Sequence, residues 1–72
     1  MCITDLGLNQ TGIITSINTE SPNVQRLMVL GLVEGATVTH LSTAGNAYEF
    51  KLLHGTIAFS KEEAQHFTVE LL

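Results

Sequence analysis

The chain has 72 residues, a net charge of −4 and only three fixed cations, and this length corresponds to one domain. Nucleic acid and anionic membrane surfaces both require clustered cations, whereas Arg26, Lys51 and Lys61 are scattered along the chain. No apolar run approaches the roughly 20 residues that cross a bilayer, and no signal peptide is recognisable. We therefore expect a cytoplasmic protein with no nucleic-acid partner and no membrane insertion.

The single cysteine, Cys2, cannot form an internal disulfide, which fits a reducing compartment. We interpret it as an inert residue at a frayed end of the chain. Hydrophobic residues make up 44% of the sequence and charged residues 14%, so one core can form and some apolar surface must remain. Contiguous apolar surface of this kind usually marks a partner.

A first strand is predicted over residues 12–17. Ile14 and Ile17 are three positions apart, which breaks the strict alternation of a strand. A β-bulge near Thr15 and Ser16 would turn both isoleucines inward, and it would also bend the strand as a small barrel requires.

A short helix is predicted over residues 22–30. Ser21 is a suitable N-cap, and Pro22 suits the first helical position, where its missing N–H has no partner to lose. Three residues at helical spacing form one apolar face that we expect in the core: Val24, Leu27 and Met28.

The end of this helix is marked by glycine. Gly31 can take the left-handed conformation that closes a helix, and Leu32 can then fold back on Leu27. Gly35, preceded by Glu34, suits a turn position that needs a positive φ.

Four further strands are predicted over residues 36–41, 47–53, 56–60 and 67–71. A loop is predicted over 42–46, a two-residue turn at His54-Gly55 and one helical turn over 61–65. The residues predicted to face inward on the third and fourth strands are Tyr48, Phe50, Leu52, Ile57 and Phe59. The pattern indicates a mainly β protein, a small antiparallel five-stranded barrel with one short helix, whose closure removes exposed strand edges. An OB-type barrel is the alternative, although it normally has longer strands.

Three histidines, His40, His54 and His66, lack the paired spacing of a metal site. Only Glu62 or Glu63 beside His66 could bind a metal weakly, so we interpret the histidines as turn or surface residues. No nucleophile signature, carboxylate pair or phosphate-binding loop is present. We expect no catalytic residue, no cofactor and no dedicated metal site, and therefore not an enzyme.

The candidate partner-binding surface lies around the end of the helix. Leu30, Leu32 and Val33 crowd a tight reversal, so one or two of them should face solvent. An apolar patch beside an arginine has the composition of an interaction hot spot. The candidate residues are Arg26, Leu30, Leu32, Val33 and Glu34. The alternative is that Leu32 only staples the helix end and that Arg26 is a solvated side chain.

The pattern R-L-x-x-L-G-L-x-x-G over residues 26–35, after the first strand, resembles the FeoA family of bacterial ferrous-iron uptake. Residues 4–6 resemble the family's opening, and residues 55–60, 63–64 and 68–69 resemble its final strand pair. Glu34 stands where many relatives have proline, Phe59 where leucine is common, and the middle hairpin lacks the prolines often found there. The resemblance covers nearly the whole chain and implies one SH3-like domain over residues 1–72.

The resemblance also implies a function. FeoA-like proteins are non-enzymatic cytosolic accessory proteins of ferrous iron transport, expected to dock on the cytosolic GTPase part of a FeoB-type membrane transporter and to modulate it. One alternative is a metal-responsive SH3-like regulatory domain related to iron-dependent repressors, which would bind a transition metal ion. Another is a self-associating interaction module, with the apolar surface used in a homo-oligomer.

Overall fold

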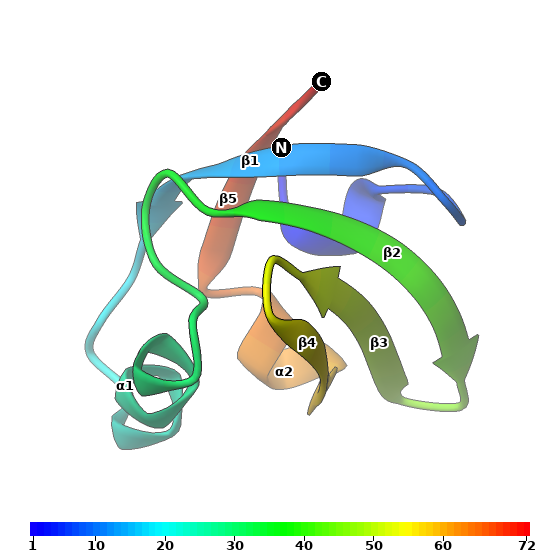
Figure 1. The fold of residues 1–72 in the computed structure, drawn as a ribbon. Helices are drawn as coiled ribbons and strands as arrows, with labels where there is room; N and C mark the ends of the chain where they lie inside the picture. The colour runs from blue at the N-terminus through cyan, green and yellow to red at the C-terminus, as the bar shows by residue number, and fades with distance from the viewer.

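In the computed structural model, which describes residues 1–72, five antiparallel strands form one strongly curved sheet (Figure 1). The strands are β1 (Thr11–Ile17), β2 (Thr37–Ala44), β3 (Ala47–Leu52), β4 (Gly55–Ser60) and β5 (Phe67–Leu71). Their order across the sheet is β4-β3-β2-β1-β5. The helical elements are a 3₁₀ turn η1 (Ile3–Asp5), α1 (Pro22–Val29) and α2 (Lys61–Ala64). No helix is both long and apolar enough to span a bilayer.

The predicted strands and helices are confirmed, and only β2 differs by more than one residue at an end. This strand continues to Ala44, so the loop predicted over 42–46 is wrong and the hairpin turn is only Gly45-Asn46. The pairing of β2 with β3 shifts register between His40 and Ser42. The extra residue at this bulge, Leu41, breaks the alternation that would have extended the predicted strand.

The predicted bulge in β1 is confirmed. The pairing of β1 with β5 shifts register between Ile14 and Ser16, which leaves Thr15 as the extra residue. Ile14 is fully buried, and Ile17 is half-buried against the core. One inserted residue therefore lets two isoleucines at odd spacing face the same interior.

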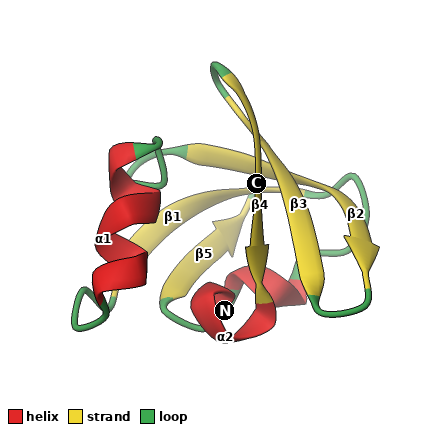
Figure 2. Ribbon diagram, turned by 90° about the horizontal axis from the view of Figure 1, so that it is seen from below, coloured by secondary structure: helices red, strands yellow, loops and turns green.

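The sheet does not close on itself. β4 and β5 are its two outer strands and do not pair with each other, so the prediction that closure removes the strand edges is wrong. Helix α2 connects the two strands directly and lies across this end of the barrel (Figure 2). Its Ala64 is fully buried in the core.

The N-terminal residues are attached to β5. The amino group of Met1 donates to the Val69 carbonyl at 3.0 Å, the Val69 N–H donates to the Met1 carbonyl at 2.7 Å, and Cys2 forms a β-bridge with Thr68. The prediction that Cys2 lies at a frayed end of the chain is therefore wrong. Cys2 is a half-buried free thiol, and its sulfur accepts a hydrogen bond from Thr4 Oγ1 at 3.2 Å.

Twelve buried apolar residues form one core inside the curved sheet. Phe50 and Phe59 stack at 5.3 Å between ring centroids, and Phe67 of β5 packs against Phe59 at 6.1 Å. Stacked and tilted ring pairs at these separations are favourable beyond the area they bury. The aromatic residues therefore connect the two outer strands of the sheet through the interior, where the backbone does not.

Candidate functional site

Helix α1 begins at Pro22 as predicted, but its N-cap differs from the prediction. The backbone of Ser21 occupies the N-cap position, and its side chain makes no capping hydrogen bond. Its carbonyl accepts from the Val24 N–H at 3.1 Å. The start of α1 is therefore fixed by the proline and the backbone. On the inner face Val24 and Leu27 are buried and Met28 is half-buried.

The end of α1 has the predicted glycine-based cap. The Leu32 N–H donates to the Leu27 carbonyl at 3.2 Å, and the Gly31 N–H donates to the Met28 carbonyl at 3.0 Å. Gly31 has a φ of 118°. These two bonds define a Schellman motif, which satisfies carbonyl groups that the last helical turn leaves free. The turn after it also has its predicted positive φ, 88° at Gly35.

The chain reverses direction at this cap, and the three apolar residues around it differ in burial. Leu32 is fully buried, which confirms that it staples the helix end and removes it from the candidate contact residues. Leu30 is 60% exposed and Val33 is 41% exposed. Because a tight reversal points successive side chains in different directions, only one of these three residues can enter the core.

Leu30 and Val33 line an open groove of about 590 Å³, which we call the docking groove. Its opposite wall is the hairpin formed by β3 and β4, including Leu52 and Leu53. Leu53 is 87% exposed at the tip of this hairpin. An apolar groove rimmed by exposed leucine side chains is the usual composition of a protein-docking surface.

Leu53 was missed by the sequence reasoning because the turn was placed one residue too late. Leu52 pairs with Gly55, so the two turn residues are Leu53 and His54 rather than His54 and Gly55. An apolar residue at a hairpin tip cannot reach the core. A leucine at the apex of a short turn was therefore the signal for an exposed contact residue.

The docking groove differs in charge from the rest of the chain. No aspartate or glutamate lines it, and Lys51 is its one fixed cation, while the chain as a whole carries −4. The exposed His54 lies on the same wall. A partner segment that combines apolar side chains with an acidic residue would complement this lining.

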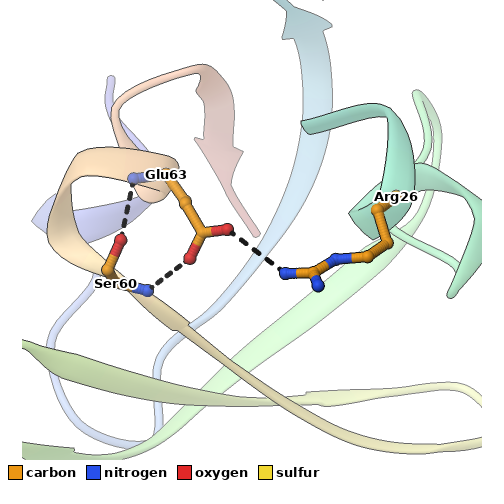
Figure 3. Close-up of polar contacts among 3 residues, drawn as sticks. All are labelled: Arg26, Ser60 and Glu63. Carbon is orange, nitrogen blue, oxygen red and sulfur yellow. Dashed lines mark hydrogen bonds and ion pairs between the residues drawn. The ribbon is translucent and has the colours of Figure 1, made fainter. Parts of the chain in front are cut away.

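Arg26 and Glu34, the other two candidate residues, do not line the groove. Arg26 faces α2, where its Nη2 atom lies 3.9 Å from Oε2 of Glu63 (Figure 3). The other oxygen of Glu63 accepts from the Ser60 N–H at 3.0 Å, and Ser60 Oγ accepts from the Glu63 N–H at 3.2 Å. These reciprocal bonds form a capping box at the start of α2. Glu34 is exposed at the turn after α1.

The histidines and carboxylates are spread over different parts of the fold. No group of three or more histidine, cysteine, aspartate or glutamate residues could hold a metal ion together. Beside His66, Glu63 is held in the capping box, and Glu62 accepts from Asn46 Nδ2 at 3.0 Å. This hydrogen bond is the main reason that the pKa of Glu62 lies below its ordinary value.

His40 is buried, so its interpretation as a turn or surface residue is wrong. It is 5% exposed and stacks on Phe50 at 5.0 Å. Its Nδ1 atom lies 2.9 Å from the Leu6 carbonyl, which can only accept, so this nitrogen carries a proton. Nε2 lies 2.7 Å from Thr43 Oγ1. Both ring nitrogens are satisfied inside the protein, which is a structural role.

Comparisons with known proteins agree with this architecture. The FeoA domain family model matches residues 1–71. The solution structure of the FeoA protein from Chlorobium tepidum is 30% identical, with a TM-score of 0.90 over 100% of this chain and 70% of that chain. FeoA from Stenotrophomonas maltophilia, solved with zinc and described as a prokaryotic SH3 domain protein, is 22% identical, with a TM-score of 0.83 over 97% of this chain and 89% of that one.

A manganese-dependent transcriptional repressor, solved with manganese, is 17% identical, with a TM-score of 0.88 over 100% of this chain and 36% of the repressor. At this identity the likeness shows a shared SH3-like fold. A search of curated protein sequences found no match. Because the family model covers all but the last residue, the chain belongs to the FeoA family.

Proposed function

We propose that this protein is a non-enzymatic accessory protein of ferrous iron uptake that docks on the cytosolic GTPase part of a FeoB-type membrane transporter. The FeoA family is linked to ferrous iron transport. The relative from Stenotrophomonas maltophilia is described as a candidate activating factor of that transport. We also expect a cytoplasmic location, because the proposed partner lies on the cytosolic side of the membrane.

The observation that carries the proposal is the docking groove. Leu30, Val33 and Leu53 expose apolar surface on both of its walls. Leaving these side chains in water has a cost that a docked partner removes, at about 25 cal/mol for each Å² of apolar surface covered. Exposed leucines gathered at one groove therefore favour a protein partner over a small polar ligand.

Docking alone does not modulate a transporter. A bound protein shifts the equilibrium between two transporter states only if it binds one of them more tightly. We therefore expect different affinities for the nucleotide-free and the GTP-bound cytosolic domain. Calorimetric titration of both forms measures this difference, and equal affinities would leave docking without a regulatory effect.

The groove is tested by charge insertion at its rim. Leu53→Glu places a carboxylate where the partner's apolar surface would lie, so binding to the cognate transporter's cytosolic domain should weaken at least about tenfold, or about 1.4 kcal/mol. Leu30→Glu should act in the same direction from the opposite wall. Both side chains are exposed, so both variants should fold.

The matched control is Leu8→Glu, because Leu8 is 62% exposed and does not line the groove. This variant carries the same change in charge and should bind as the wild type does. If Leu53→Glu, Leu30→Glu and Leu8→Glu all bind as tightly as the wild type, the groove is not the docking surface. If the wild-type chain does not bind the cytosolic domain, the docking proposal itself fails.

A further inference from the structure

The outer edge of β4 carries backbone groups with no partner in the fold. Leu52 and Gly55 flank a two-residue turn, and residues in this position form a hydrogen-bonded pair. Hydrogen-bonded and non-bonded pairs alternate along an antiparallel ladder, so Thr56 and Ala58 point their N–H and C=O groups away from β3. Because β4 is an end strand, nothing pairs with these groups.

Ser60, two residues further along, confirms this alternation. Its N–H also points outward, and it donates to Oε1 of Glu63 at 3.0 Å. The capping box of α2 therefore provides an acceptor for the outward N–H of Ser60, whereas the outward backbone groups of Thr56 and Ala58 have no partner. Both residues are exposed.

Natural proteins blunt such edges with charged side chains, proline or a bulge. β4 has none of these: its sequence is Gly-Thr-Ile-Ala-Phe-Ser, and its pairing with β3 is regular throughout. The opposite outer strand, β5, is protected, because Met1 and Cys2 pair along it. An unprotected, uncharged edge opposite a covered one indicates a surface meant for strand addition.

We propose that two copies of this chain associate through antiparallel pairing of their β4 edges about a twofold axis at Ile57. In this register Thr56 of one copy lies opposite Ala58 of the other. Every free N–H and carbonyl of these two residues then finds its partner in the second copy. The two sheets become one continuous sheet.

A second copy matches this edge, because Thr56 and Ala58 lie symmetrically about Ile57 and a twofold axis there pairs each open position with the other. The net charge of −4 opposes association in general, but β4 carries no charge and adds no repulsion at the seam. The two half-buried Ile57 side chains meet at a non-hydrogen-bonded position, where opposite side chains approach most closely. A single strand pair buries little area, so the dimer is weak and forms at high protein concentration.

The test is Ala58→Pro in the full chain, followed by sedimentation velocity over about two decades of concentration. The Ala58 N–H makes no bond to β3, so proline at this position preserves the internal ladder and removes only the outward donor. The wild type should sediment faster as its concentration rises, and the variant should remain a monomer. Amide signals that shift with concentration should centre on Thr56 to Ala58.

Ala58→Val keeps the N–H and should self-associate as the wild type does. Ala58→Lys places a charge on the exposed edge of each copy and should weaken association without disturbing the core. If the wild type stays monomeric at the highest concentration, the proposal is overturned. If the proline variant self-associates unchanged while circular dichroism shows a native fold, association occurs at another surface and the proposal is equally overturned.

Discussion

Gly31 at the end of α1 lies against Leu52 on β3, so that a Cβ placed on this glycine would be 3.4 Å from Leu52 Cδ1. The space would admit a methyl group, but the backbone does not suit one, because φ is 118°. We expect Gly31→Ala to lower the free energy of unfolding by about 1–2 kcal/mol. Urea denaturation measures the change. An effect below about 0.3 kcal/mol would show that the cap relaxes without strain.

The buried His40 should contribute strongly to stability. His40→Ala removes a stacked ring and leaves the Leu6 carbonyl without its donor. We expect a loss of about 3 kcal/mol, from the cavity and the unpaired carbonyl together. His54→Ala is the matched control, because His54 is an exposed turn residue and its loss should stay within about 0.5 kcal/mol. Equal effects at the two histidines would contradict the structural role of His40.

The two interactions of Glu63 should differ in strength. Ser60→Ala breaks the half of the capping box that satisfies the Glu63 N–H, and it should cost about 1 kcal/mol in thermal unfolding. Arg26→Ala should have an effect of less than about 0.5 kcal/mol, because the ion pair is 3.9 Å long and the arginine side chain is 71% exposed. A larger loss from the arginine change would mean that the ion pair, rather than the cap, orders α2.

The lowered pKa of Glu62 predicts a pH effect with a defined sign. Its first cause is the hydrogen bond from the Asn46 side chain, which favours the ionised carboxylate in the folded chain. This stabilisation is fully present at a pH above the pKa that Glu62 has in the unfolded chain. It is lost as the pH falls through the lower pKa that Glu62 has in the folded chain. We expect Asn46→Ala to raise the pKa of Glu62, as measured by an NMR titration of its side-chain carboxyl. An unchanged titration curve would show that the Asn46 hydrogen bond is not the main cause of the lowered pKa.

Lys51 should contribute to partner binding through its charge. Lys51→Glu reverses the one fixed cation of the docking groove and should weaken binding to the transporter's cytosolic domain, most strongly at low salt. Lys61→Glu is the control, because it makes the same charge change on an exposed residue outside the groove. If Lys51→Glu and Lys61→Glu weaken binding to the same extent, the effect comes from the net charge of the whole chain and not from the charge of the docking groove.

The helix cap could be predicted from sequence because its signals are local. A glycine at the end of a short apolar helix, followed by a leucine, specifies the bonds to Leu27 and Met28 without knowledge of the rest of the chain. The strands were predictable for the same reason, since alternation along β3 and β4 is regular. Where a bulge interrupts alternation, at Leu41, the prediction stopped three residues short of the end of β2.

The site was only partly predictable, because it depends on contacts between distant segments. Local crowding predicted that one or two of Leu30, Leu32 and Val33 face solvent, but not which; the structure exposes Leu30 and Val33 and buries Leu32. The facing wall at Leu53 lies about twenty residues away in sequence, and no local pattern brings it near α1. The burial of His40 likewise depends on the Leu6 carbonyl, which comes from a part of the chain that shows no periodicity.

The pairing of β1 with β5 has a consequence for biosynthesis. Gly12 pairs with Leu71, so β1 finds one of its two neighbours only after residue 71 has left the ribosome. Until then Ile14 lacks its partner Val69, and the core lacks Phe67. Contacts this distant in sequence form late, so the nascent polypeptide should stay unfolded and vulnerable to proteases until β5 has emerged.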